Sequence, residues 1–277
     1  MHKAPANTES IKQAEREWHD ADYRIHAPLE YPQDLSAFLK RFQRTELTPF
    51  CEGGWSYWAD PRVEVLAGLQ VTPEMNVLDY GCGSGKLGMY LSLQGANVWG
   101  FDLSGEGVRI ASEVAKNYGV SAKFEQMDAE DLHYPDDFFD LSIGFGVLHH
   151  VIKYPKAASH LHRILRPGGR ALFSETLWDN PLINFARLFT TADAEAGDAH
   201  LTEKSILEFG RNFHRIHLEK RSLIYMLKRF CKLPERDLSA PLRPRPFWRV
   251  IKSLDQKLLQ FAALRRYCGE VMVWLYK

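Results

Sequence analysis

Short apolar runs and amphipathic stretches alternate between residues 75 and 177. The apolar runs predict strands, because they are short, rich in Val, Ile, Leu and Phe, and bounded by glycine, proline or acidic residues. The predicted strands are MNVLDY (75–80), NVWGFD (97–102), AKFEQMD (122–128), FFDLSIGFG (138–146) and GRALFSETL (169–177). The amphipathic stretches predict helices at 86–95, 105–119 and 154–165. Since strands alternate with connecting helices, we expect an α/β fold with a doubly wound parallel sheet.

The residues before this pattern predict helices. ESIKQAEREWHDA (9–21) consists mainly of strong helix formers. In YPQDLSAFLKRFQRT (31–45), the spacing of Leu35, Phe38, Leu39 and Phe42 places them on one helix face. A shorter helix is expected at PRVEVLAGL (61–69). We therefore expect an N-terminal helical cap over residues 1–60.

After Trp178 the pattern is weaker. Partial alternation predicts a sixth strand at 213–223, and GEVMVWLY (269–276) predicts a closing strand. Between them, FWRVIKSLDQKLLQFAAL (247–264) predicts a basic amphipathic helix. Because the sheet is completed at the end of the chain, we expect one domain over 1–277. Its parts are the cap, a core (61–177) and a C-terminal region (178–277) with a basic insertion.

Composition narrows the class of protein. Of the 277 residues, 45% are hydrophobic and 25% are charged, as in ordinary globular proteins. No apolar run approaches the ~18 residues of a spanning helix, and the polar N-terminus lacks the apolar core of a secretory signal. The four cysteines are isolated and none has a histidine at zinc-ligand spacing. We therefore expect a cytoplasmic protein without a metal site.

Charge is distributed unevenly along the chain. Residues 211–277 carry 16 Lys and Arg against 5 Asp and Glu, whereas residues 1–210 carry 19 against 30. In one interpretation the two parts attract each other, or the basic face is simply solvated. In the other, the basic part meets an anionic partner, such as a lipid surface, a phosphorylated substrate or nucleic acid.

The stretch NVLDYGCGSGKLG (76–88) places Gly81, Gly83 and Gly85 between a predicted strand and a predicted helix. Such a turn lets a ligand approach the backbone at the start of the helix. The dinucleotide fingerprint needs a further glycine where Lys86 stands, and the loop lacks the GKS or GKT of a P-loop. The spacing therefore disfavours NAD, FAD and nucleoside triphosphates.

Acidic residues mark the ends of three predicted strands. Asp79 stands just before the glycines, where it would repel a pyrophosphate and suit a cationic ligand. Asp102 ends the second strand, and an acid there can accept both hydroxyls of a ribose. Asp128 ends the third strand, within reach of an adenine amine. A ligand with a ribose, an adenine and a positive group but no phosphate is S-adenosylmethionine (SAM).

Five motifs in this order, VLDYGCGSG, VWGFDLS, MDAEDL, FFDLSIGFGVLHHV and LRPGG, resemble those of class I SAM-dependent methyltransferases. The resemblance is to the broad small-molecule group that includes the ubiquinone/menaquinone methyltransferases, and it covers about residues 75–177. It implies a Rossmann-like sheet of seven strands, mostly parallel, with an antiparallel last strand. Residues 213–223 and 269–276 are similar to the family's last two strands.

The resemblance also implies roles for individual residues. Gly81 and Gly83 would let the methionine part approach the backbone, with Asp79 beneath the loop. Asp102 would hold the ribose. The remaining cofactor contacts that the resemblance implies are Leu103 beside the adenine, Asp128 and Ala129 at its edge, and Gly144 and Phe145 along the cofactor. Family members often carry a polar residue where Gly146 stands here.

Methyl transfer needs alignment of the acceptor in a dry site and, for some acceptors, a base. His149 and His150 follow the fourth strand and are the candidate catalytic bases. Each could instead pack and hydrogen-bond to hold its loop. Glu175 could bind the acceptor or cap the next segment, and His200 could equally be a feature of a helix N-terminus.

Aromatic residues of the cap are candidates for covering the sulfonium, which is attracted to aromatic faces. Trp18, His19 and Tyr23 could do so, or could pack between helices. In GGWSYWAD (53–60), the two glycines suggest a hinge. The aromatic residues that follow, Trp55, Tyr57 and Trp58, could line the pocket.

We therefore expect a SAM-dependent methyltransferase that acts on oxygen, nitrogen or carbon of a small-molecule or lipid-like acceptor. The basic segment 224–266 could lie on a membrane or pack as an ordinary helix. Nucleic acid is disfavoured as a partner, because no RNA-binding module is visible. Two alternatives remain open: an enzyme that uses SAM without methyl transfer, such as a cyclase or decarboxylase, and a non-catalytic SAM-binding partner protein.

Overall fold

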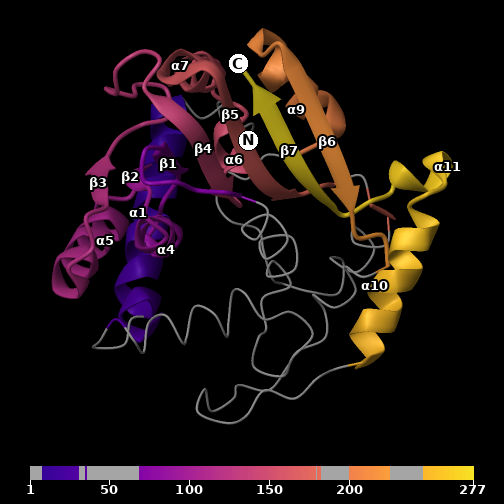
Figure 1. Ribbon diagram of the computed structural model, residues 1–277, viewed down its shortest axis with the longest axis horizontal. Coiled ribbons are helices and arrows are strands. Elements are labelled where there is room, and N and C mark those ends of the chain that lie inside the picture. Colours follow the sequence, from indigo (N-terminus) through magenta and orange to yellow (C-terminus); the bar gives the residue numbers. More distant parts are fainter. Residues whose placement is uncertain (1–7, 31–34, 36–68, 179, 182–199, 225–245) are drawn as a thin grey trace, which may run out of the picture.

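A seven-stranded sheet organises the molecule in the computed structural model, in the order β3-β2-β1-β4-β5-β7-β6 (Figure 1). The structure describes residues 8–30, 35, 69–178, 180–181, 200–224 and 246–277. The strands are β1 (Asn76–Tyr80), β2 (Asn97–Asp102), β3 (Lys123–Gln126), β4 (Phe139–Phe145), β5 (Leu165–Thr176), β6 (Arg215–Arg221) and β7 (Glu270–Tyr276). Strands β1 to β5 pair in parallel, and β7 runs antiparallel to both β5 and β6. The predicted fold class is confirmed.

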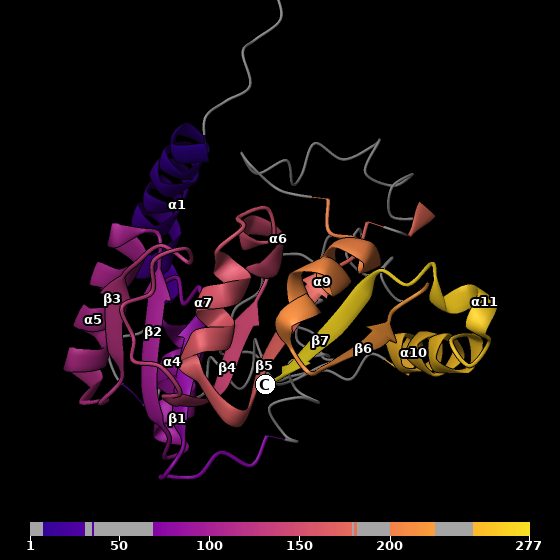
Figure 2. The same ribbon diagram turned by 90° about the horizontal axis from the view of Figure 1, so that it is seen from above.

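Helices cover both faces of the sheet and its margins (Figure 2). They are α1 (Thr8–Glu30), α4 (Lys86–Leu93), α5 (Gly105–Tyr118), α6 (Leu148–Val151), α7 (Ala157–Ile164), α9 (Glu203–Phe209), α10 (Pro246–Leu258) and α11 (Ala262–Arg265), with a 3₁₀ turn at Gly210–Asn212. Capping residues fix two of these ends. The Ser104 hydroxyl accepts the Gly107 N–H at the start of α5, and Gly119 closes that helix with φ 66°.

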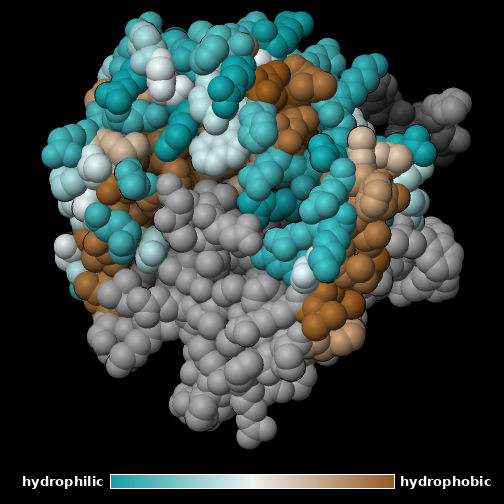
Figure 3. Space-filling view, turned by 45° about the vertical axis from the view of Figure 1, so that its right-hand side comes forward, coloured by the Kyte–Doolittle hydropathy of each residue, from teal (hydrophilic) through white to brown (hydrophobic). Residues whose placement is uncertain are grey.

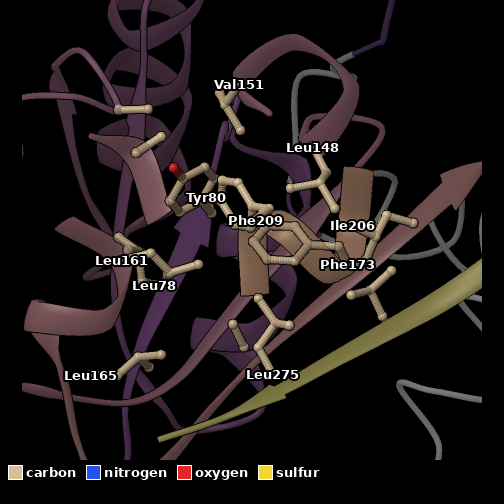
Figure 4. Packing of buried hydrophobic residues seen from close by; sticks show 14 of the residues in the cluster. Leu78, Tyr80, Leu148, Val151, Leu161, Leu165, Phe173, Ile206, Phe209 and Leu275 are labelled. Carbon is tan, nitrogen blue, oxygen red and sulfur yellow. The ribbon is translucent and has the colours of Figure 1, made fainter. Parts of the chain in front are cut away.

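Alternating side chains of the strands build a core on each face of the sheet. Leu78, Phe173 and Leu275 pack with α6, α7 and α9 on one face, as Figure 4 shows. On the other face Val77 and Leu172 pack with Leu91 and other side chains. This alternation follows from the two-residue period of a strand, which sends neighbouring side chains to opposite faces.

The structure corrects several predicted boundaries. Helix α1 runs on to Glu30, beyond the predicted end at 21. Helix α7 ends earlier than predicted, because Leu165 already pairs with Phe139 as the first residue of β5. The predicted helix 247–264 is interrupted after Leu258, where Arg265 Nε donates to the carbonyl of Leu259 and helps end the first segment. Apart from residue 35, the predicted helix at 31–45 lies outside the described residues, and so does most of the one at 61–69.

Among the described residues, none of the helices is long and apolar enough to span a lipid bilayer.

Candidate functional site

The glycine loop after β1 leaves no room for side chains at two of its positions. Gly81 and Gly83 have φ angles of 69° and 51°, a region that glycine adopts readily. A Cβ on Gly81 would lie 2.3 Å from Val147 Cγ2, and one on Gly83 would lie 2.4 Å from the Tyr23 hydroxyl. Backbone conformation and close packing therefore both require glycine here.

The two acids nearest the loop hold its shape. Asp79 is 2% exposed, and its Oδ2 accepts the Gly88 N–H at 2.8 Å, which ties the first turn of α4 to the end of β1. Asp102 accepts the N–H groups of Gly83 (2.8 Å) and Ser104 (2.9 Å). Each carboxylate oxygen has more than one acceptor position, so Asp102 keeps capacity for the hydroxyls of a ribose.

Asp128 is already engaged by α1. Its Oδ2 accepts from Lys12 Nζ at 2.6 Å, and its Oδ1 accepts the Glu130 N–H at 2.9 Å. Lys12 also donates to Glu130 Oε2 at 2.8 Å and is 5% exposed. Burial alone lowers the pKa of Lys12, but the hydrogen bonds and charges of the two carboxylates outweigh it and raise the pKa above 10.5. The expected adenine contact therefore shares its carboxylate with a buried ammonium group.

Helix α1 crosses the ends of several elements. At one point Asp20 accepts from the Ser104 hydroxyl and from the Glu106 N–H, at the start of α5. At another, Glu15, 3% exposed, accepts from Lys153 Nζ at 2.5 Å and from the Tyr154 hydroxyl at 2.8 Å. Polar anchors thus fix α1 across the carboxyl edge of the sheet (Figures 1 and 2).

The aromatic residues of α1 differ in position. Tyr23 lies against the glycine loop, and its ring also approaches Gly107. His19 stacks on Tyr23 with ring centroids 6.0 Å apart and meets the edge of His150 at 5.2 Å. Trp18 is 40% exposed and touches His19 edge-on. Tyr23 and His19 are therefore at the site, whereas Trp18 lies at its outer margin.

Glu175 joins the ends of two neighbouring strands. It is fully buried at the end of β5, and its Oε1 accepts the N–H groups of Val147 (2.9 Å) and Leu148 (2.6 Å), which begin the turn α6. Its Oε2 lies 2.8 Å from Nδ1 of His149. A proton on Nδ1 is favoured by this contact, so the carboxylate sets the tautomer and orientation of the imidazole. Glu175 therefore caps a segment, as one alternative expected, but it is the segment after β4.

His150 faces a different acid from His149. Its Nδ1 is 3.7 Å from Glu15 Oε1, and its ring centroid is 4.1 Å from that of His149. His149 thus contacts the buried carboxylate of β5, and His150 contacts α1. The short helix α6, which the hydrophobic pattern did not predict, sets the two rings side by side.

The remaining predicted residues surround the same loops. Gly144 packs so closely that a Cβ would lie 2.6 Å from Val147 Cγ1. The Leu103 carbonyl accepts from Gln126 Nε2 at 3.0 Å. Ala129 is buried, Phe145 packs with the core beneath β4, and His200 stacks on Trp178 with centroids 3.7 Å apart. Residues 53–58, with the predicted hinge and aromatics, lie outside the described residues.

Residues that the sequence did not single out complete this site. Lys12 and Glu15 are charged residues three apart on α1, and both are buried against the sheet's edge. Val147 covers Gly81 and Gly144. The sequence only weakly indicated that Lys12 and Glu15 are buried, because a Lys and a Glu at this spacing are also common on solvent-exposed helix faces.

Comparison of the sequence with known protein families indicates which chemistry the site supports. Residues 78–173 match the family described as a methyltransferase domain. Over these residues the chain is similar to class I SAM-dependent methyltransferase domains. SAM is the cofactor of such domains, and Asp102 fits it, because its carboxylate keeps acceptor capacity for the hydroxyls of a ribose.

Two curated relatives illustrate the range of the family. The ubiquinone biosynthesis O-methyltransferase of Pseudomonas syringae pv. tomato is 36% identical over 140 residues, which are 50% of this chain and 55% of the relative. Phosphoethanolamine N-methyltransferase 1 of Arabidopsis thaliana is 32% identical over 148 residues, 53% of this chain and 30% of the relative. The similar part thus spans about half, or less, of these relatives.

One solved structure shows that the fold is shared with other chemistry. The cyclase SpnF aligns with a TM-score of 0.57 and 16% identity, over 96% of each chain. At this identity the likeness concerns the fold alone.

Proposed function

We propose that this chain transfers the methyl group of SAM to an acceptor that must lose a proton, namely a hydroxyl of a small or lipid-like molecule. The observation that carries the proposal is the buried Glu175 that orients His149 beside the glycine loop. Bound SAM supplies a methyl group that is made electrophilic by its sulfonium.

The chain's own residues would prepare the acceptor. His149, with Nδ1 directed to Glu175, presents Nε2 as a base for the acceptor hydroxyl. The Glu175 carboxylate then stabilises the imidazolium that forms. Val147 and Tyr23 pack on the glycines and limit the space and the water around the reacting groups.

Relatives support the class of reaction without fixing the acceptor. One is named an O-methyltransferase of ubiquinone biosynthesis and another an N-methyltransferase of phosphoethanolamine. The first suits a base that removes a hydroxyl proton. The second would need phosphate recognition, which the described contacts of His149 and Glu175 do not supply.

The test is a measurement of S-adenosylhomocysteine formed by the purified protein. Phenols and catechols with and without a long apolar tail, phosphoethanolamine, and no acceptor would be compared. We expect turnover with a phenol or catechol and SAM binding by calorimetry. Turnover with phosphoethanolamine alone would contradict the acceptor class.

A second candidate, a SAM-binding enzyme without methyl transfer, is suggested by the shared fold of the cyclase SpnF. SAM binding with no S-adenosylhomocysteine from any acceptor would favour it.

A further inference from the structure

Helix α10 and the turn after it carry an exposed apolar stripe. Phe247, Val250, Leu254 and Phe261 are 64%, 65%, 45% and 64% exposed. The first three are spaced three and four residues apart, which places them on one helix face. Figure 3 shows hydrophobic atoms running along this part of the molecule with hydrophilic atoms beside them. Within the described residues, the other exposed large apolar side chains are the scattered Trp18, Ile25 and Leu207.

The charge around the stripe is basic. Residues 246–266 contain five Lys and Arg and one acid, Asp255. Asp255 is 2% exposed and directed inward, where it accepts the N–H groups of Leu223 (2.7 Å) and Ile224 (2.6 Å). The one carboxylate of these two helices is therefore withdrawn from the surface. Lys257, by contrast, is exposed next to the stripe.

The connection that contains the stripe enters the sheet at the edge where the candidate site is. Helices α10 and α11 connect the end of β6 to the start of β7, where Glu270 pairs with both Arg221 and Thr176. Thr176 is the last residue of β5 and follows Glu175 directly. Helix α11 therefore leads into the strand end that lies beside Glu175, and Figure 1 draws α10 next to the end of β6.

We propose that the stripe formed by Phe247, Val250, Leu254 and Phe261 inserts into the surface of an anionic lipid bilayer. Apolar side chains in a basic setting are the pattern of helices that lie in the interface of such bilayers. A second copy of this chain is a poorer occupant, because a symmetric contact would bring the same basic residues together. The supply of a lipid-like acceptor from that surface rests on the proposed function, whereas lipid binding itself does not.

Co-sedimentation with vesicles tests the proposal without SAM or acceptor. Vesicles of phosphatidylcholine alone would be compared with vesicles of equal parts phosphatidylcholine and phosphatidylglycerol. We expect binding to the anionic vesicles to be about tenfold stronger and to weaken at high salt. The triple variant Val250→Ser/Leu254→Ser/Phe261→Ser should lose about tenfold in binding.

Matched variants make the result specific. Leu254→Ser should weaken vesicle binding, whereas Leu207→Ser on α9, where the side chain is 44% exposed, should not. Lys257→Glu should weaken binding to anionic vesicles only. Equal binding to both vesicle types, or full binding by the triple variant, would overturn the proposal. So would a dimer in light scattering that the triple variant dissociates. Because these readouts need neither SAM nor turnover, their failure is distinct from failure of the proposed function.

Discussion

Glu175 Oε2 lies 2.8 Å from His149 Nδ1, although the two residues are 26 apart in the chain. The sheet brings them together, because β4 and β5 are parallel neighbours with Phe145 opposite Ser174. The same carboxylate accepts the N–H groups of Val147 and Leu148. A single buried acid thus fixes both the backbone and the imidazole of the turn after β4.

Replacing His149 should reduce turnover more than cofactor binding. We expect His149→Asn to lower kcat by about 10²-fold or more, the usual contribution of a general base. The Kd for SAM, measured by calorimetry, should change little. The neighbouring His150→Asn is the control, and it should leave most turnover intact. Similar losses in both variants would contradict the assignment of the base.

Replacing Glu175 should lower the stability of the protein. Glu175→Gln keeps the size but exchanges charged hydrogen bonds for weaker ones, so we expect the free energy of unfolding to fall by about 2 kcal/mol. Urea denaturation measures this fall, and the exposed Glu208→Gln is the control. Unchanged stability would show that the carboxylate does not hold the turn.

Removing the carboxylate of Asp102 should weaken SAM binding. We expect Asp102→Ala to cost about 1.5–3 kcal/mol of binding free energy, as for hydrogen bonds to a charged group. Calorimetry would measure it, with the exposed Asp131→Ala as a control. An unchanged affinity in a folded variant would refute the ribose assignment.

The stabilisation that the contacts of Glu15 give to the packing of α1 should depend on pH. Burial raises the pKa of this carboxyl, but the nearby His150 ring and the hydrogen bonds from Lys153 and Tyr154 outweigh it, so the pKa is below 4.5. The stabilisation is therefore complete above about pH 4.5, the unfolded value, and is lost as pH falls through the lower folded pKa. Glu15→Gln should lower the free energy of unfolding by about 3 kcal/mol at neutral pH, as expected when one partner of a buried pair is removed.

The readout of that variant is urea denaturation between pH 7 and pH 3. Stability of the parent protein should fall more steeply on acidification than that of Glu15→Gln. Parallel pH curves for the two proteins would rule out the Glu15 anchor as the titrating contact.

Two buried tyrosines should respond differently to loss of the hydroxyl. The Tyr80 hydroxyl has no hydrogen-bond partner within the described residues, whereas that of Tyr154 donates to Glu15 at 2.8 Å. Tyr80→Phe should therefore be neutral or stabilising, and Tyr154→Phe should cost about 1.5–3 kcal/mol. Thermal unfolding of both variants measures the difference. A large loss of stability in Tyr80→Phe, with none in Tyr154→Phe, would contradict this prediction.

The sequence by itself determined the elements and their order. Strand and helix periods, the glycine loop and the acids at strand ends are local patterns, and together they predicted the sheet that the structure shows. The acids Asp79 and Asp102 follow from this, because the carboxyl ends of parallel strands share one edge.

Tertiary structure alone decided which side chains meet. Lys12 reaches Asp128, 116 residues away, and Glu15 reaches Lys153, 138 residues away. Glu175 accepts hydrogen bonds from the segment after β4, not from the described part of the segment that follows β5. Asp255 points away from the exposed face of α10 and accepts the N–H group of Leu223. Local patterns carry the period of an element but not its partner, which depends on how helices and strands pack. The sequence therefore determined the scaffold of the site, and packing decided how α1, β4 and β5 complete it.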